Sequence, residues 1–191
     1  MADTTGRGTG RGAATRALIL AAALEAFAES GYRGTSVREI AARCGLTHPA
    51  LIYHFPTKAD LLLAVLERRD EDGPLEGLAA DRVLARLVET VGANQSRRGL
   101  IELFATLSAE ATAADHPAHA WFARRYANLV ATLTRAYAEL AETGELRPGV
   151  DPGVAARRLV AVMDGLQVQW LLDPEVDMVA GVAAQIAADR G

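Results

Sequence analysis

Apolar residues at helical spacing, interrupted by glycine and proline, most strongly limit the folds open to this sequence. Over residues 14–30, Leu20, Leu24 and Phe27 fall on one face of a helix. Gly31 follows in the position of a helix C-cap. No run of about four to eight residues alternates β-branched and polar side chains between turn signals, as a strand would. The sequence therefore predicts an all-α protein.

Two short helices joined by a glycine turn are predicted next. The stretch from Ser36 to Glu39 has the Ser-x-x-Glu form of a capping box, with Ser36 as N-cap. This helix ends near Gly45. Thr47 then caps a second helix, with Pro49 in the first turn, where its missing N–H costs nothing. The inward-facing apolar side chains of a helix-turn-helix complete the pattern. They are Ile40, Ala41, Cys44, Leu46 and Leu51.

About nine helices are expected in all. A fourth begins near Thr57 and ends at Gly73-Pro74, and proline and glycine signals separate most of the later ones. The later helices are expected at 79–93, 97–114, 117–143, 152–172 and 175–189.

Four segments follow from this pattern. Residues 1–13 are rich in glycine, threonine and arginine without apolar periodicity, which predicts a flexible basic arm. Residues 14–58 form a three-helix helix-turn-helix domain, 59–73 a connecting helix, and 74–191 a larger helical domain.

Charge is distributed unevenly between these segments. The chain carries a net −4, and the residues up to Lys58 hold seven basic and four acidic side chains, or +3, which leaves −7 for the remainder. A basic front end on an acidic body indicates a polyanionic partner for the front end. The apolar stretches fall short of the roughly 18 residues of a membrane span. Residues 16–28 could pass for a secretory signal, but Glu25 and the helical spacing favour an amphipathic helix, so we expect a cytoplasmic protein without membrane contact.

The second helix of the motif is predicted to lie in the major groove of double-stranded DNA, with its first turn against base edges. Threonine and histidine there can hydrogen-bond to bases, and proline offers an apolar contact. Side chains at its far end, and the lysine that starts the next helix, suit phosphate oxygens. The expected contacts are Thr47, His48, Pro49, Ala50, Tyr53, His54 and Lys58.

The stretch "TSVREIAARCGLTHPALIYHFPTKADLL" resembles the signature of the TetR family of bacterial helix-turn-helix transcriptional regulators. The resemblance covers about residues 16–66, and beyond them only the all-helical layout is similar. It implies phosphate contacts from Thr35 and Ser36, and a phosphate or base contact from Arg38. The sequence departs from the family at Ile52, where many members carry a tyrosine, so any contact there would be apolar.

The resemblance also implies a homodimeric repressor that a small-molecule effector releases from a palindromic operator. Independently, the apolar arc of the 152–172 helix covers about half its circumference, so it must bury a second side on another element. Pairing with a second copy is the expected solution, and an internal hairpin of a monomer is the alternative. The expected dimer residues are Leu159, Val162, Met163, Leu166, Trp170, Val179, Val182 and Ile186.

By the same resemblance, the larger domain holds the effector pocket. Candidate lining residues are Phe104, Ser108, Trp121, Phe122, Tyr126, Asp164, Gln167 and Trp170. Asp164 and Gln167 border an apolar arc, where an unpaired polar group is costly. They line a cavity or hydrogen-bond across the dimer, and the sequence leaves both readings open.

Other functions have weaker support. An enzyme would need a convergent acid–base or nucleophile set, which the scattered polar residues do not provide, and no cofactor or metal is expected. His116 and His119 lack a third ligand at a matching spacing, and Cys44 reads as a small buried hydrophobe. Arg7 and Arg11 either enter a minor groove or belong to a disordered leader. An architectural DNA-binding protein without an inducer remains the alternative function.

Overall fold

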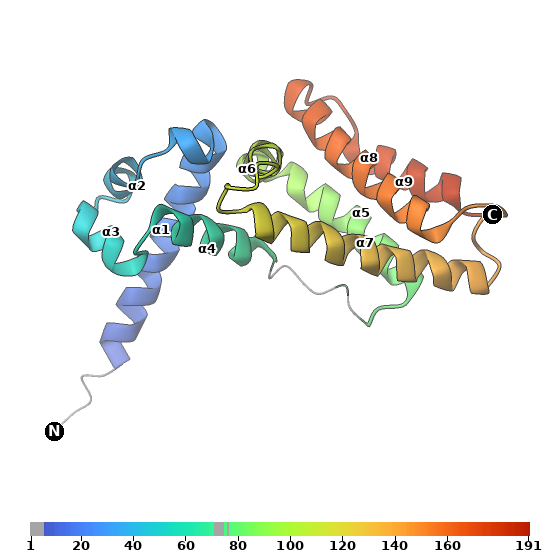
Figure 1. The fold of residues 1–191 in the computed structure, drawn as a ribbon, viewed down its shortest axis with the longest axis horizontal. Coiled ribbons are helices and arrows are strands. Elements are labelled where there is room, and N and C mark those ends of the chain that lie inside the picture. Colours follow the sequence, from blue (N-terminus) through green and yellow to red (C-terminus); the bar gives the residue numbers. More distant parts are fainter. Residues whose placement is uncertain (1–5, 71–74, 76) are drawn as a thin grey trace. The chain divides into compact units, whose positions relative to one another are not determined.

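The computed structural model describes residues 6–70, 75 and 77–191, and the side chains of 6–11, 69 and 70 are not described. Among the described residues the chain forms nine α-helices and a single isolated β-bridge, which confirms the predicted all-α class (Figure 1). In chain order they are α1 (Gly6–Gly34), α2 (Val37–Arg43), α3 (His48–His54), α4 (Lys58–Asp70), α5 (Ala80–Gln95), α6 (Arg98–Glu110), α7 (His119–Glu142), α8 (Pro152–Leu172) and α9 (Met178–Asp189).

The chain divides into two compact units. The first unit comprises Met1–Asp72 and Thr106–His119, and the second comprises Gly73–Ala105 and Ala120–Gly191. Helix α4, expected to connect two domains, lies in the first unit, where its apolar face packs against α1. The end of α6 and the turn after it also belong to the first unit.

The first unit is built around α1, against which α2 and α4 pack, while α3 packs on α2. Its core draws on every one of these helices, with Phe27, Ile40, Leu51 and Leu62 fully buried. Burying side chains of this size stabilises a fold by about 1.5–3 kcal/mol each. The predicted caps are present, since the Ser36 and Thr47 hydroxyls accept the backbone N–H of Glu39 and Ala50. Gly45 has a φ of 66°, which explains the glycine at this turn.

Helix α1 is longer than the sequence predicts. It begins at Gly6 instead of near residue 14, so residues 6–13 of the expected arm are helical. Glycines spaced through this stretch disfavour a helix, but propagation from an existing helix costs far less than nucleation. Residues 1–5 of the expected arm, and the side chains of Arg7 and Arg11, lie outside the description. Gly31 is non-helical (φ 66°, ψ −179°) and marks a kink before the last turn.

The second unit packs α8 on α9 and α9 on α5, with α7 contributing Leu133, Tyr137 and Leu140 to the same core. The Asp151 and Asp177 carboxylates cap α8 and α9 by accepting the backbone N–H three residues on, at 2.8 and 2.9 Å. Because Asp177 is the cap, α9 begins three residues later than expected. At the other end of α9, the fully buried Asp189 pairs with Arg158 of α8.

Candidate nucleic-acid interface

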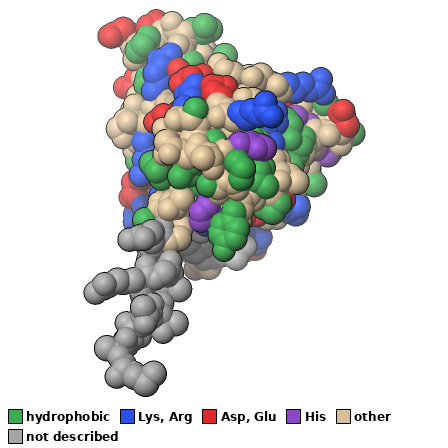
Figure 2. Space-filling model, turned by 90° about the vertical axis from the view of Figure 1, so that its left-hand side faces the viewer, with side chains coloured by type: hydrophobic (Ala, Val, Ile, Leu, Met, Phe, Trp, Pro, Cys, Tyr) green, Lys and Arg blue, Asp and Glu red, His purple; other side chains and the backbone are tan. Residues whose placement is uncertain are grey.

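Helix α3 presents its first turn to solvent. Thr47, His48 and Pro49 are exposed, and Tyr53 at the other end is 85% exposed, although its ring is large and mostly apolar. The Tyr53 ring stands edge-on to that of His54, with centroids 5.4 Å apart. Figure 2 shows histidine and hydrophobic side chains gathered on this side of the molecule, with basic side chains nearby. An exposed aromatic next to histidine and hydroxyl groups suits contact with a polar, ordered surface better than it suits water.

The remaining expected contacts of this segment differ in how open they are. Ser36 and Arg38, at the start of α2, are exposed. Ala50 and His54 are half-buried, because the opposite face of α3 packs Leu51 into the core. The Ser36 and Thr47 oxygens already accept a backbone N–H, but each hydroxyl proton is still available to a phosphate or base.

Thr35 does not point outward as the resemblance implies. Its side chain is buried at 2% exposure, and its hydroxyl lies 2.9 Å from the Ala26 carbonyl oxygen and 2.7 Å from that of Gly31. The hydroxyl has one proton to share between these two carbonyls near the kinked end of α1. Thr35 is therefore a structural cap of α1, which corrects the expected side-chain contact with phosphate.

The side chain of Lys58 also makes hydrogen bonds within the first unit. Its ammonium group donates to the carbonyl oxygens of Tyr32 (2.7 Å) and Thr35 (2.8 Å), and it lies 4.3 Å from the centre of the Tyr32 ring. Burial lowers the pKa of Lys58, and the nearby Glu110 carboxylate opposes that shift. An ammonium has three N–H groups, so a single donor is left for a phosphate. Lys58 therefore links α4 to the end of α1, and its predicted contact with phosphate has only the third N–H to use.

Glu110, at the end of α6, holds the other side of the same kink. Its carboxylate accepts the backbone N–H of Tyr32 at 2.9 Å and stands where a side chain on Gly31 would begin. The imidazole of His116 lies edge-on to the Tyr32 ring, and its Nε2 is 3.5 Å from Glu110. Sequence reasoning missed Glu110, because nothing near it in the chain marks a partner 78 positions earlier.

Arg16 is a second residue that the sequence pattern did not single out. Its guanidinium lies 4.1 Å from the centre of the Phe55 ring and donates to the His54 carbonyl oxygen at 3.3 Å. These contacts join the N-terminal half of α1 to the C-terminal end of α3, where positive charge is favourable to the helix dipole. Phe55 is 2% exposed, so the contact rests on a fixed surface. Arg16 thus helps to orient the helix that presents His48 and Tyr53.

The two histidines considered as metal ligands contact backbone groups close to them in the sequence. Nδ1 of His116 accepts the Ala118 N–H, and Nδ1 of His119 lies 2.8 Å from the Ala111 carbonyl oxygen. Across the described part of the chain, no three His, Cys, Asp or Glu side chains are grouped so that they could hold a metal ion. None of the described helices has both the length and the apolarity needed to cross a membrane.

Three of the eight side chains expected to line an effector pocket are aromatic rings that pack against one another. Phe104, Trp121 and Phe122 are buried, and their rings meet edge-on at 4.9–6.0 Å. Ser108 belongs to the first unit, whereas the other seven candidates belong to the second. Trp170 is buried under the Arg98 guanidinium. Aromatic residues at helical spacing therefore form core here, as such residues usually do.

The two polar candidates have different environments. The Tyr126 hydroxyl donates to the Asp164 carboxylate at 2.8 Å. Burial raises the pKa of Asp164, while this hydrogen bond and the charge of Arg125 act in the opposite direction. Gln167 lines a small pocket in the second unit. It is the single expected pocket residue there, beside Val91, Asn94, Ile101, Met163, Leu166, Met178 and Val182.

The residues expected at a dimer interface differ in how exposed they are. Four of them are buried within their own unit: Leu159, Trp170, Val182 and Ile186. A wide apolar arc on α8 reflects contact with both α9 and the rest of the core. The exposed apolar side chains of α8 are others, namely Val154 (59%), Ala161, Val168 (50%) and Leu172 (83%). They follow spacings of seven, seven and four residues, which places them on one stripe.

Comparison with known proteins decides the family. Residues 19–65 match the family described as "Bacterial regulatory proteins, tetR family", and residues 79–190 match "BetI-type transcriptional repressor, C-terminal". The chain belongs to the TetR family. Two TetR-type matches of different extent illustrate this. RutR of Escherichia coli (strain K12) is 38% identical over 65 residues, which are 34% of this chain and 31% of RutR. PksA of Bacillus subtilis (strain 168) is 28% identical over 167 residues, 83% of this chain and 80% of PksA.

Solved TetR-type structures share the fold over most of the chain. One, described as a molecular basis for control of antibiotic production by bacterial hormones, is 30% identical with a TM-score of 0.68, covering 93% of this chain and 98% of the other. A complex of SmeT with triclosan is 25% identical with a TM-score of 0.74, covering 93% and 92%. The match to RutR, by contrast, spans only about a third of that protein's length.

Proposed function

We propose that the chain is a homodimeric transcriptional repressor that binds a palindromic operator through α3 and is released by a small-molecule effector held in the second unit. The observation that carries the proposal is the exposed first turn of α3. There Thr47, His48 and Pro49 stand free of intramolecular packing at the end of a helix that Leu51 anchors in the core. A repressor is favoured by the match of residues 79–190 to a repressor domain.

Dimerisation is supported by the exposed stripe of α8. Val154, Val168 and Leu172 are half or more exposed, and with Ala161 they form one line of apolar side chains along α8 that a second copy could cover. The outward residues of α9 beside it are mostly alanines, which allow close approach of a second helix pair. Two copies related by a two-fold axis would present two α3 helices to two half-sites.

The test is selection of bound sequences from random double-stranded DNA at one fixed, near-physiological salt concentration. We expect an enriched palindrome whose half-sites lie about one helical turn or more apart. A flat profile whose binding depends steeply on salt would contradict the proposal and favour an architectural DNA-binding protein. His48→Ala should change the selected sequence, because His48 faces the bases in the proposed geometry.

A further inference from the structure

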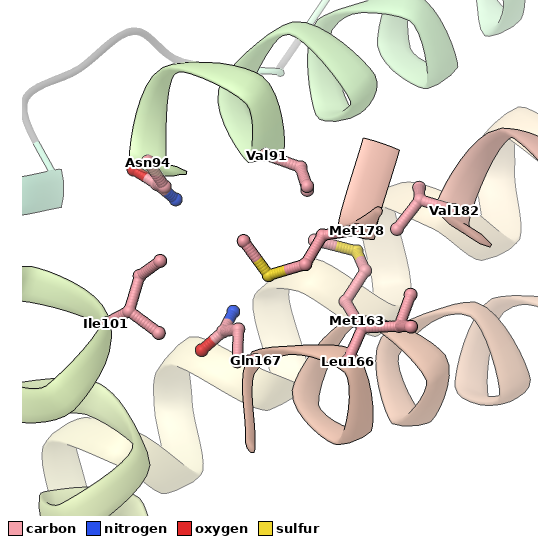
Figure 3. Close-up of a pocket in the computed structure, with 8 residues that line it drawn as sticks. All are labelled: Val91, Asn94, Ile101, Met163, Leu166, Gln167, Met178 and Val182. Carbon is pink, nitrogen blue, oxygen red and sulfur yellow. The ribbon is translucent and has the colours of Figure 1, made fainter. Parts of the chain in front are cut away.

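The pocket of the second unit holds polar groups that the fold itself does not use. Helix α5 contributes Asn94, α8 contributes Gln167, and α9 contributes Met178 (Figure 3). Asn94 is 8% exposed as a residue, and Gln167 is half-buried. None of the hydrogen bonds among the described residues uses the side-chain amide of Asn94 or Gln167. The chain therefore leaves the donors and acceptors of both amides open to a molecule that enters the pocket.

The rest of the lining is apolar and uncharged. Six aliphatic or thioether side chains surround the two amides: Val91, Ile101, Met163, Leu166, Met178 and Val182. No ionisable side chain is among the lining residues. A charged group entering this space would lose its hydration without gaining a counter-ion, at a cost of several kcal/mol. An amide offers both donor and acceptor atoms, so two of them suit a ligand with a carbonyl beside an N–H.

We infer that this pocket is the effector site, and that the effector is a neutral molecule with an apolar body and an amide-like head. The inference rests on the proposed function and specifies its effector. In Figure 3 the amides of Asn94 and Gln167 turn toward the same space, and the side chain of Met178 reaches in beside them. The head of the ligand hydrogen-bonds to the two amides, and its body contacts the methionines and aliphatic side chains.

Entry of the ligand requires side chains to move, since the enclosed space is close to that of one water molecule. Met163 and Met178 are suited to this, because unbranched thioether chains change rotamer at low cost. Helices α8 and α9 already pack closely against each other beside the pocket. Gly181 of α9 lies so close to Leu166 of α8 that a Cβ there would be 2.8 Å from its Cδ1. Ligand binding would therefore displace methionine side chains before it displaces α8 from α9.

The simpler alternative is a single buried water that bridges the two amides. The two accounts differ in what removal of an amide does. For a water site, replacing Asn94 with an apolar side chain of similar volume changes stability and nothing else. For an effector site, the same change weakens ligand binding while leaving operator binding intact.

The experiment uses the full chain and three probes with the same eight-carbon body: octanamide, octanoate and octyltrimethylammonium. Binding is measured by calorimetry, and release is measured on the operator found by selection. We expect octanamide to bind and to weaken operator binding, and each charged probe to bind at least about 100-fold more weakly. Asn94→Leu and Gln167→Met should each weaken octanamide binding about tenfold.

Gln169→Met is the matched control, because Gln169 lies on the same helix but is exposed. It should bind octanamide like the unmodified protein, and all three variants should bind the operator normally. The inference is overturned if octanamide does not bind, if octanoate binds as well as octanamide, or if Asn94→Leu leaves octanamide binding unchanged. In each of these cases operator selection still stands as a separate result, so failure of the effector site is distinct from failure of the proposed function.

Discussion

The two units place their polar side chains in opposite ways. In the first unit the residues proposed to read DNA, His48 and Tyr53 among them, are exposed, and the partly or fully buried Thr35 and Lys58 are satisfied by backbone carbonyls. In the second unit the informative polar residues are buried: Asn94 faces a pocket and Asp189 is fully enclosed. A long polyanion can be met only at a surface, whereas a small neutral molecule is recognised best where water is excluded.

The largest effect on the free energy of unfolding is expected in the second unit. Asp189 accepts hydrogen bonds from Tyr137 (3.3 Å) and Gln185 (2.9 Å) and pairs with Arg158. Asp189→Ala leaves these donors without a partner, and we expect a loss of about 3 kcal/mol in the free energy of unfolding, measured with urea. Asp115→Ala removes an exposed carboxylate 3.7 Å from Arg33 and should change stability by less than about 0.5 kcal/mol. If both substitutions lowered the free energy of unfolding equally, the proposed contrast between the two units would be wrong.

The exposed stripe on α8 is the exception within the second unit, and it can be tested through assembly. Val168→Asp places a charge on a surface proposed to be buried between copies, so the dimer should weaken by at least about 100-fold, or about 2.7 kcal/mol. Analytical ultracentrifugation measures the change. Leu78→Asp, at another exposed leucine outside the stripe, should leave the dimer intact. If the unmodified protein were a monomer, burial between two copies could not explain the exposed apolar residues of α8.

In the first unit, Arg16→Gln separates orientation of α3 from direct contact with phosphate. Loss of its contacts with Phe55 and the His54 carbonyl should weaken operator binding about tenfold. Because Arg16 acts through α3, the slope of log affinity against log salt should not change. Arg38→Gln, at an exposed arginine, should reduce that slope by about one.

A purely structural role for Arg16 predicts a different result. The thermal midpoint would fall, but the folded protein would bind the operator with unchanged affinity. A reduced salt slope for Arg16→Gln would instead assign Arg16 a direct contact with phosphate, and either result contradicts our interpretation.

The smallest effect concerns Asp164 and depends on pH. Burial raises its pKa in the folded protein, so the folded state binds more protons than the unfolded state above the ordinary aspartate value of about 3.9. Stability from this group is therefore present at low pH and is lost as the pH rises through the raised pKa. Asp164→Asn retains an acceptor for Tyr126 and should stabilise the protein increasingly as the pH rises from 4 to 7. Urea unfolding from pH 4 to 7 checks this, with the exposed Asp173→Asn as a control that should show no such gain.

Local signals in the sequence predicted local structure well. The caps at Ser36 and Thr47, and the turn at Gly45, depend on residues within three positions of each other. The direction of a side chain depends instead on distant neighbours. Lys58 has the position of a phosphate contact, but its ammonium group is taken up by carbonyls 23 and 26 residues earlier. The pocket could not be predicted either, because Asn94 and Gln167 come from helices that nothing local brings together.

The kink at Gly31 restricts the order in which substitutions at positions 31 and 110 can be accepted. A larger residue at position 31 would meet two obstacles, a φ of 66° that disfavours side chains and the Glu110 carboxylate already in its place. Shortening Glu110 first removes one obstacle, at the expense of the hydrogen bond to Tyr32. Replacement of Gly31 before Glu110 meets both obstacles at once. Among diverging copies of this chain, a change at position 110 should therefore precede any change at position 31, and the two positions should drift as a pair.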